Sequence, residues 1–318
     1  MKTLMIIFLL LAPGVSGKED IPDLLFMFWN LENFFDSFDD GDGESDKEFS
    51  PDGDRRWSYS RFIKKLNLTC KTVLWVAGCE GRMPDAIGFA ELENALVLRR
   101  LLQSDMLRDM DWKHVHYDSP DPRGIDVGLI YRSSTLELLE SRPVHIYEDD
   151  GEIMKTRDIL LALFRVRGKG DTIALTVNHH PSKYGGKSSM VRREKAMLAL
   201  SSLCDSISCP MIAMGDFNDT PDATQFSLIE ERLENKAERL FLEGEGTIRY
   251  QGRWELIDMF LESRDTGWDS EMKICRVPYL MAADRPHGGM KPLRTYSGPR
   301  YSFGVSDHLP VVLKVKNK

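Results

Sequence analysis

Short apolar runs that border clusters of polar residues are the feature that most constrains the fold of this chain. Met211–Asp219 is the clearest example, because four apolar residues precede Gly215, which permits a tight exit, and then Asp216 and Asn218. In an α/β sheet, the carboxyl ends of the strands are where ligands bind. Taken alone, this segment is equally typical of an ordinary Asx-rich turn. The functional interpretation gains weight because other predicted strands end in the same way.

Strand patterns of this kind alternate with helical patterns, which indicates an α/β fold. Apolar residues recur at helical spacing in Tyr59–Cys79 and in Ser188–Ile207. Further strand patterns beside polar clusters are Leu24–Trp29, Ala86–Ala90, Thr172–Asn178 and Leu309–Val315. The charged segment Asp222–Leu242 is predicted to be mostly a surface helix, and Trp254–Leu261 is predicted to be a strand with Asp258 in its middle.

The N-terminus has the layout of a secretory signal peptide. Lys2 precedes an apolar run from Leu4 to Ala12, and small residues follow as far as Gly17. This run is too short to span a bilayer comfortably. A buried N-terminal strand is the alternative. We expect a signal peptide over residues 1–17, one domain over residues 18–318, and export to the periplasm or the extracellular space.

Charge and cysteine content exclude some classes of function. The formal net charge of −8 argues against strong non-specific binding to nucleic acid, which depends on Lys and Arg. It does not exclude a nuclease, because bound divalent cations offset negative charge locally. The five cysteines include no C-x-x-C pair, which argues against a zinc site. In an oxidising compartment Cys204 can pair with Cys209, or Cys70 with Cys79, and the sequence does not decide between paired and free thiols.

Polar residues beside the predicted strands supply the chemistry of a candidate site. They are Asn30, Glu32, Glu91, His179, Asp216, Asn218, Asp258, Asp307 and His308. Carboxylates, amides and imidazoles without a cysteine cluster suit a hard cation such as Mg²⁺ better than Zn²⁺. Such a cation can activate a water molecule, and imidazoles can hold or protonate phosphate oxygens. The residue types therefore predict metal-assisted hydrolysis of a phosphoester.

Each of these residues also has a structural interpretation. His308 alone is more often a structural histidine, because ordinary ion-pair networks also perturb histidines. Glu32 fits the start of a helix, where a negative charge is favourable. Glu93 is predicted to pair on a helix surface and not to bind metal. Asp258 in an apolar strand would be costly without a partner, which favours a histidine or a metal beside it.

The sequence resembles the endonuclease/exonuclease/phosphatase superfamily, which includes the DNase I-like nucleases. Seven motifs follow the family's order from about Phe26 to Val315. They are N-x-E-N at Asn30–Asn33, G-F-A-E-L-E-N at Gly88–Asn94, D-V-G-L-I-Y-R at Asp126–Arg132, N-H-H-P-S-K at Asn178–Lys183, G-D-F-N-D at Gly215–Asp219, I-D at Ile257–Asp258 and S-D-H-L-P-V at Ser306–Val311. Any one of them is weak, whereas all of them in order are specific. The chain looks most like secreted bacterial members.

The resemblance implies a four-layer α/β sandwich, in which two packed mixed β-sheets are flanked by helices. It also implies a metal site with Glu91 as the principal ligand, supported by Glu32 and Asp307. The implied metal ion is Mg²⁺, with Mn²⁺ as a substitute. His308, oriented by Asp258, is implied to be the acid–base or phosphate-stabilising histidine.

The remaining implied roles concern the water molecule and the phosphate. Asp216 would orient or deprotonate the attacking water or bind a second metal ion. Asn30 and Asn218 would bind the scissile phosphate, and Asn218 would also serve catalysis. His179 would be a second catalytic histidine in contact with the phosphate or the leaving group. Arg157 would add a positive contact to the substrate.

Two departures from the family pattern affect the expected pocket. The first histidine motif usually reads H-W-P-S-R, and His180 and Lys183 replace the Trp and the Arg. Before the last motif the family often has Gly-Gly or Gly-aromatic, where this chain has residues 303–305, Phe-Gly-Val. In the family the Trp is a packing residue, so His180 bears on the pocket wall and leaves the core mechanism standing. The loop of residues 303–305 faces the substrate in the family, so it bears on substrate choice more than on the chemistry.

The predicted function is therefore an exported nuclease that hydrolyses phosphodiester bonds with a metal-activated water. One alternative is a phosphatase or phospholipase C-like hydrolase of inositol phosphates, nucleotides or sphingomyelin. Another is an inactive binding protein on the same fold. We expect a monomer without stable membrane insertion. A nuclease needs a basic groove with aromatic residues, for which the candidates are Arg276, Arg285, Lys291, Arg294 and Arg300.

Overall fold

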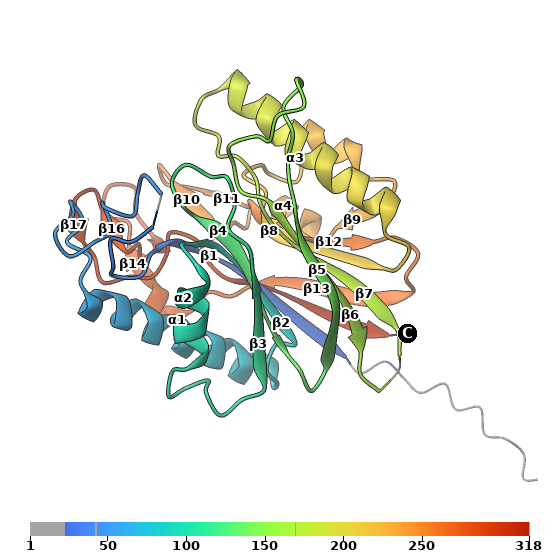
Figure 1. Cartoon of the computed structure of the whole chain (residues 1–318), viewed down its shortest axis with the longest axis horizontal. Helices are drawn as coiled ribbons and strands as arrows, with labels where there is room; N and C mark the ends of the chain where they lie inside the picture. The colour runs from blue at the N-terminus through green and yellow to red at the C-terminus, as the bar shows by residue number, and fades with distance from the viewer. Residues whose placement is uncertain (1–22, 42, 169, 318) are drawn as a thin grey trace, which may run out of the picture.

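Two mixed β-sheets pack face to face, and helices cover the outer face of each sheet (Figure 1). The computed structural model describes residues 23–41, 43–168 and 170–317. The predicted four-layer sandwich is confirmed, whereas the predicted signal peptide lies outside the described residues. Within these three ranges, no helix is both long enough and apolar enough to cross a membrane.

The first sheet has the strand order β13-β18-β1-β2-β4-β3. Its strands are β1 Leu24–Phe34, β2 Ala86–Leu92, β3 Trp112–His116, β4 Asp126–Arg132, β13 Trp268–Ile274 and β18 Val311–Asn317. β1 and β2 run parallel, and the other neighbours are antiparallel. Helices α1 (Tyr59–Glu80) and α2 (Ala95–Leu102) cover its outer face, since their apolar residues share a core with Trp29 and Ile87.

The second sheet has the strand order β5-β6-β7-β8-β12-β9. Its strands are β5 Leu136–Val144, β6 Ile159–Val166, β7 Thr172–His179, β8 Met211–Asp216, β9 Leu233–Asn235 and β12 Asp258–Ser263. β7 and β8 are parallel. Helices α3 (Lys187–Ser206) and α4 (Glu238–Leu242) contribute apolar residues to its core. Between the two sheets lie buried side chains such as Phe28, Leu129 and Met214.

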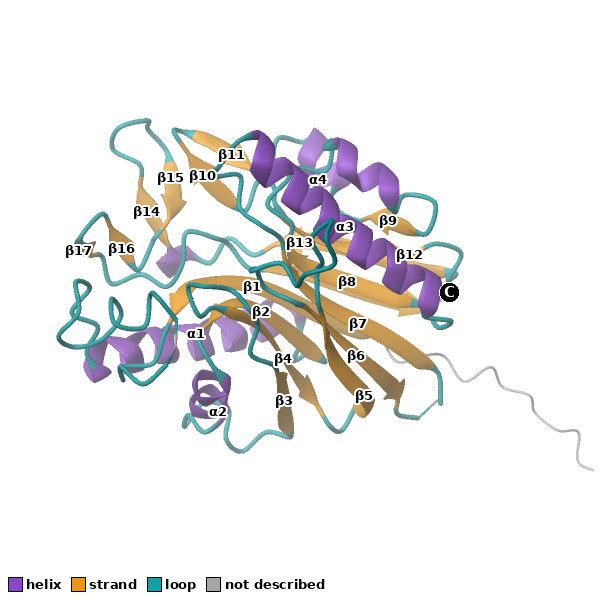
Figure 2. Ribbon diagram, turned by 45° about the horizontal axis from the view of Figure 1, so that its top comes forward, coloured by secondary structure: helices purple, strands orange, loops and turns teal. Residues whose placement is uncertain are grey.

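Three two-stranded ribbons lie at the same end of the sandwich (Figure 2). They are β10 Ile248–Tyr250 with β11 Arg253–Glu255, β14 Met281–Ala283 with β15 Met290–Pro292, and β16 Tyr296–Ser297 with β17 Arg300–Tyr301. Short 3₁₀ helices cover Thr224–Leu228 and Pro278–Leu280. Because most of these segments fall in the long loop that precedes Asp307 and His308, that loop is ordered rather than featureless.

Two predictions about the second sheet are wrong in detail. Asp222–Leu242 is not mostly helical, because β9 interrupts it and pairs with β12, which outweighs helix propensity. Trp254–Leu261 is not one strand, because β11 pairs with β10 whereas β12 pairs with β8. Asp258 is consequently the first residue of β12 and not its middle, and it lies opposite Asp216.

Gly215 is needed for a different reason from the predicted tight exit. It lies inside β8 next to β7, and a Cβ atom there would approach the carbonyl oxygen of Asn178 to 2.4 Å. That separation is far shorter than a van der Waals contact. Glycine therefore lets β7 and β8 bring His179 and Asp216 to the same edge of the sheet.

Candidate active site

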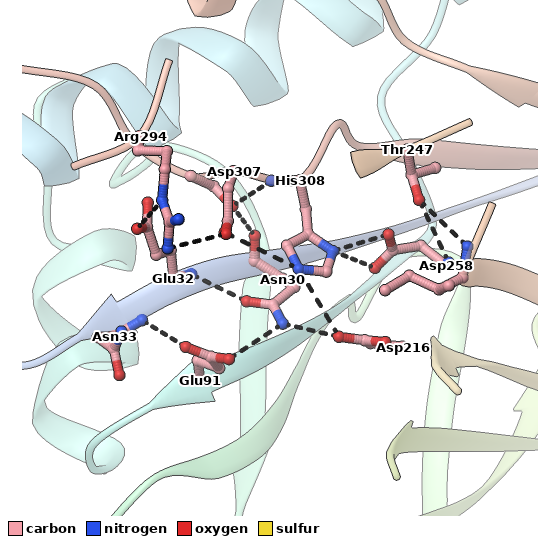
Figure 3. Close-up of polar contacts among 12 residues, drawn as sticks. Asn30, Glu32, Asn33, Glu91, Asp216, Thr247, Asp258, Arg294, Asp307 and His308 are labelled. Carbon is pink, nitrogen blue, oxygen red and sulfur yellow. Dashed lines mark hydrogen bonds and ion pairs between the residues drawn. The ribbon is translucent and has the colours of Figure 1, made fainter. Parts of the chain in front are cut away.

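The predicted site residues gather at the edge where β1, β2, β7 and β8 end and where β12 begins (Figure 3). The residues that hydrogen bonds and close ion contacts link into one cluster are Asn30, Glu32, Glu91, His179, Asp216, Asn218, Asp258, Asp307 and His308. They come from both sheets and from the segment before β18. The structure thus brings together all the predicted site residues except Arg157.

The backbone at three of these residues is in the left-handed region. The φ angles are +48° at Glu32, +61° at Glu91 and +53° at Asn218. Residues other than glycine rarely adopt this backbone conformation. The pairing of β1 with β2 shifts register between Asn30 and Phe34, and that of β2 with β4 shifts after Ala90. Such irregularities redirect side chains, and here they turn Glu32 and Glu91 toward the site.

Asn30 joins the two sheets. Its amide nitrogen donates to Asp216 Oδ2 at 3.0 Å and to Glu91 Oε1 at 3.4 Å, and its oxygen accepts from the Glu32 backbone at 2.9 Å. The side chain is buried, with 1% exposure. Ser306 Oγ also donates to the Asn30 carbonyl, at 2.6 Å. Asn30 therefore fixes the distance between two carboxylates, in addition to any contact with the phosphate.

His308 is oriented by Asp258, as predicted. Its Nδ1 lies 2.8 and 3.0 Å from the two oxygens of Asp258, which leaves Nε2 facing Asp216 at 3.8 Å and Asp307 at 3.9 Å. Burial lowers the pKa of His308, but the surrounding carboxylates, Asp258 first, outweigh burial and raise that pKa well above its ordinary value. The imidazole is therefore a cation at neutral pH.

Asp216 and His179 occupy the opposite side of the site. His179 Nε2 lies 3.6 Å from Asp216 Oδ2 and 3.9 Å from Glu91 Oε1. Burial and the nearby cation of Arg157 lower the pKa of His179 well below its ordinary value. Burial and the charge of Asp258 raise the pKa of Asp216 to about 7. The site thus holds one charged and one neutral histidine around a carboxylate that can exchange a proton near neutral pH.

The three predicted metal ligands differ in what already binds them. Glu91 accepts from the backbone of Asn33 at 2.8 Å and from Asn30. Glu32 accepts from Arg294 Nε at 2.8 Å and from the backbone of Thr295 at 2.9 Å. Arg294 Nη2 also lies 3.0 Å from Asp307. This set of carboxylate oxygens fits a hard divalent cation such as Mg²⁺, with Arg294 placed between two of the three ligands.

Arg157 does not line the site. Its guanidinium is buried and donates to Asp121 at 2.9 Å and to the carbonyl of His180 at 2.7 Å. Asn218 Nδ2 donates to the same carbonyl at 2.9 Å, and its backbone N–H donates to Asp216 Oδ1 at 2.9 Å. Arg157 is therefore a positioning residue that holds the backbone beside Asn218, and a direct contact with substrate remains only a prediction.

Sequence reasoning missed Lys65, which lies beneath the site. Its ammonium group donates to the Glu32 carbonyl at 2.6 Å and to Thr295 Oγ1 at 2.8 Å. The side chain is fully buried, and burial lowers its pKa to about 8. The helical spacing could have predicted that Lys65 is buried, because it falls between Phe62 and Leu66 on the apolar face of the predicted helix.

The structure also tests what the sequence left open or predicted for the cysteines and for Glu93. Glu93 is not a surface residue of a helix, because it precedes α2, is buried and accepts from the backbone of Asp36 at 2.7 Å. The prediction of a surface pair is therefore wrong. All five cysteines are described, and none of them forms a disulfide in this structure.

Several solved structures share the architecture. An endonuclease/exonuclease/phosphatase from Bacteroides vulgatus has a TM-score of 0.59 and 15% identity, covering 93% of this chain and 100% of that one. Humanised D. rerio TDP2 has a TM-score of 0.59 and 14% identity, covering 92% and 98%. A mannosyl-6-phosphatase from Bacteroides thetaiotaomicron has a TM-score of 0.57 and 14% identity, covering 92% and 99%. At such identities the similarity shows a shared fold.

Sequence comparison places the chain more specifically. Comparison with curated proteins gives no match. The family model described as "Endonuclease/Exonuclease/phosphatase family" matches residues 25–317, nearly the whole described chain. This range contains every strand of both sheets apart from the first residue of β1, and it contains the complete cluster around Asp216. The chain therefore belongs to the endonuclease/exonuclease/phosphatase family.

Proposed function

We propose that the protein is an exported, divalent-metal-dependent phosphoesterase that cleaves phosphodiester bonds in nucleic acid. The observation that carries this proposal is the array in which Asp258 orients His308 toward Asp216, while Asn30 holds Asp216 beside Glu91. Family membership supports hydrolysis of a phosphoester as the reaction class. Export is proposed from the signal-peptide pattern of residues 1–17.

The array divides the work of hydrolysis between two kinds of side chain. Asp216, with its pKa raised to about 7, is suited to take a proton from the attacking water. The cationic His308 is suited to bind a phosphate oxygen and to stabilise the charge that develops on it. The neutral His179 and the amides of Asn30 and Asn218 can orient the phosphate through hydrogen bonds.

A metal ion would be held by Glu91 together with Asp307 and Glu32. When bound, Mg²⁺ or Mn²⁺ would neutralise negative charge on the phosphate and lower the pKa of a water molecule. Asn30 would then keep Glu91 at a fixed distance from Asp216. Lys65 would keep the backbone of Glu32 in place from below.

A phosphatase of small phosphoesters is the second candidate, and a specific observation favours it. Three of the basic residues expected to form a nucleic-acid groove are already bound to acids. Arg276 pairs with Glu245, Lys291 lies 3.5 Å from Asp284, and Arg294 contacts Glu32 and Asp307. These pairs leave less positive charge for tracking a polynucleotide backbone. One structural neighbour is named as a mannosyl-6-phosphatase.

One experiment separates the candidates. The protein from Lys18 onward is assayed with Mg²⁺ or Mn²⁺ on plasmid DNA, RNA, bis-p-nitrophenyl phosphate, inositol polyphosphates, sugar phosphates and sphingomyelin. Glu91→Ala and His308→Ala variants and an EDTA-treated sample are run in parallel. Nucleic-acid cleavage that all three treatments abolish would support the nuclease. Turnover of a small phosphomonoester alone would support the phosphatase, and no turnover on any substrate would favour a binding protein.

A further inference from the structure

We propose a second cation site, specific for Ca²⁺, in an acidic pocket between the loop after β1 and the end of β2. The acidic pocket is defined by Asp40, Gly41, Asp46 and Glu93, and residues 118–122, 124 and 126 form its facing wall. Its open volume is about 470 Å³. The proposal does not rest on the proposed phosphoesterase activity.

Two buried carboxylates in this pocket each have one oxygen without a partner. Asp46 is 2% exposed and Glu93 is 8% exposed. Asp46 Oδ2 accepts from the backbone of Gly41, and Glu93 Oε2 accepts from that of Asp36. When both groups are ionised, Asp46 Oδ1 and Glu93 Oε1 have no hydrogen-bond donor among the described residues. Burying such an oxygen is costly unless a donor or a cation binds it.

The two side chains also converge on one point. A Cβ atom on Gly41 would lie 3.3 Å from Asp46 Oδ2 and 3.6 Å from Glu93 Oε1. Glycine leaves this space free of side-chain atoms. Asp46 Oδ2, which accepts from the Gly41 N–H, and Glu93 Oε1 therefore both lie next to the Gly41 backbone.

The protein supplies no counter-charge at this position. On the facing wall, Asp121 pairs with Arg157 at 2.9 Å and Asp126 contacts His116 at 3.2 Å. Within residues 23–41, 43–168 and 170–317, no Lys, Arg or His forms an ion pair with Asp46 or Glu93. Burial, followed by the nearby Asp36 and Asp46, raises the pKa of Glu93 to about 9, so without a cation the carboxyl groups of Glu93 and Asp46 share a proton. A cation bound between them would take the place of that proton.

The donor set favours Ca²⁺. All candidate ligands are oxygens, from Asp46, Glu93 and the exposed Asp40 at the rim. Ca²⁺ accepts irregular sets of carboxylates, backbone carbonyls and waters, whereas Mg²⁺ requires near-octahedral geometry and keeps most of its water. A pocket made from one loop and one strand end matches the less demanding ion.

A bound ion would fasten the loop of residues 36–58 to the sandwich. This loop already contacts the facing wall through Glu44 N–H, which donates to the Pro122 carbonyl at 2.8 Å. Arg55 of the same loop donates to the Gly298 carbonyl at 2.7 Å, beside the segment that carries Arg294. Ca²⁺ would therefore protect the loop from proteolysis and stabilise one wall near the active site.

The test measures binding of Ca²⁺ to the EDTA-stripped protein by calorimetry, in the presence of Mg²⁺. We expect one Ca²⁺ per chain, and a rise in Tm of about 5 °C when Ca²⁺ exceeds its Kd roughly 100-fold. Asp46→Asn and Glu93→Gln keep the side-chain shape and should weaken binding roughly 10-fold or more. Asp52→Asn, an exposed acid of the same loop, is the matched control and should bind as the wild type does.

Further variants keep the test decisive. The Asp46→Asn and Glu93→Gln proteins should be at least as stable as the wild type without Ca²⁺, because the new amide can donate a hydrogen bond to the carboxylate that remains. Glu91→Gln should retain Ca²⁺ binding, since it alters only the active site. Absence of Ca²⁺ binding to the wild type, equal binding to Asp46→Asn and Glu93→Gln, or loss of binding in Glu91→Gln alone would each overturn the proposal.

Discussion

Glu91 of the active site and Glu93 of the acidic pocket lie two residues apart at the end of β2, yet their carboxylates differ in how many hydrogen bonds they accept. Glu91 enters the active site, where both of its oxygens accept hydrogen bonds. Glu93 enters the acidic pocket, where one oxygen has no partner among the described residues. Residues two apart on a regular strand share a face, and the left-handed backbone at Glu91 separates them here.

The two clusters differ in the groups that stabilise their carboxylates. In the active site, fixed donors such as Asn30, His308 and Arg294 hold the carboxylates in place. In the acidic pocket, the backbone supplies one donor to each carboxylate and the side chains supply no cation. The active site is therefore organised before it binds a metal ion, whereas the pocket holds two carboxyl groups that share a proton, which we propose an ion replaces.

The largest expected effect comes from Glu91→Gln. This change removes the charge and keeps only one of the two hydrogen bonds from Asn30 and Asn33, because an amide has a single acceptor oxygen, so metal-dependent turnover should fall roughly 10³-fold. Steady-state kinetics on whichever substrate the proposed assay identifies measures it, with the exposed Glu230→Gln as control. If the variant kept more than a tenth of the wild-type kcat/KM, the charge of Glu91 would not be needed for metal-dependent turnover, and the contrast between Glu91 and Glu93 would not hold.

Asp258→Asn should have the next largest effect. It removes the carboxylate that orients His308 and raises its pKa, so kcat should fall roughly 10²- to 10³-fold. The pKa of His308, followed by NMR of its ring protons, should drop toward its ordinary value. An unchanged His308 titration would contradict the assigned orientation, even if activity fell.

Arg294→Ala tests whether the guanidinium of Arg294 competes with a metal ion for Glu32 and Asp307. Removing the guanidinium frees Glu32 and Asp307, so Mg²⁺ or Mn²⁺ should bind roughly 10-fold more tightly. Calorimetry or electron paramagnetic resonance of Mn²⁺ measures this affinity without turnover. Arg300→Ala, in the same loop, is the control. Unchanged or weaker metal binding would mean that Arg294 does not compete with the ion.

His180→Phe should give the smallest effect, on stability at low pH. Burial, followed by the charges of Arg157 and Arg193, lowers the pKa of His180 to about 3. Between pH 3 and the ordinary histidine pKa of about 6.5, the unfolded chain therefore binds more protons than the folded chain does. The free energy of unfolding of the wild type consequently falls as the pH falls through that window. The phenyl ring of the variant cannot titrate, and it can still pack against Phe217, which the imidazole contacts edge-on in the wild type.

The magnitude at pH 5 is about 2 kcal/mol, since each pKa unit corresponds to about 1.4 kcal/mol. Urea unfolding at pH 5 and pH 8 measures it. The variant should have a flatter dependence on pH than the wild type has. Parallel curves for the two proteins would show that His180 is not held neutral by the fold.

Much of this molecule could be predicted from its sequence. Apolar strands that end in Asn30, Glu91 and Asp216 predicted both the sheets and the residues that meet at their edge. The motifs also paired Asp258 with His308, which lie 50 residues apart. The strand ends follow from the local pattern of consecutive residues, whereas the pairing of Asp258 with His308 followed from the family resemblance.

What the sequence did not predict depends on distant packing. The contact of Arg294 with Glu32 joins residues 262 apart and needs the fold of the long loop. Lys65 falls in the predicted helix Tyr59–Cys79, but the helical pattern does not show that its ammonium group reaches the Glu32 carbonyl. The short strand β9 formed because β12 offered an edge, which no local propensity encodes.

The left-handed backbone at Glu32, Glu91 and Asn218 has a consequence for how this protein can change. Glycine adopts that conformation without strain, and each non-glycine residue there costs about 1 kcal/mol or more. Replacing any of the three with glycine would therefore relieve strain while it removed a side chain from the site. It would also remove the hydrogen bonds that the side chain makes, to Arg294 for Glu32, to Asn33 for Glu91 and to the His180 carbonyl for Asn218, each worth about 1 kcal/mol or more. Strain and hydrogen bonding therefore offset each other at these three positions, so the site keeps its unusual backbone at little net cost in stability.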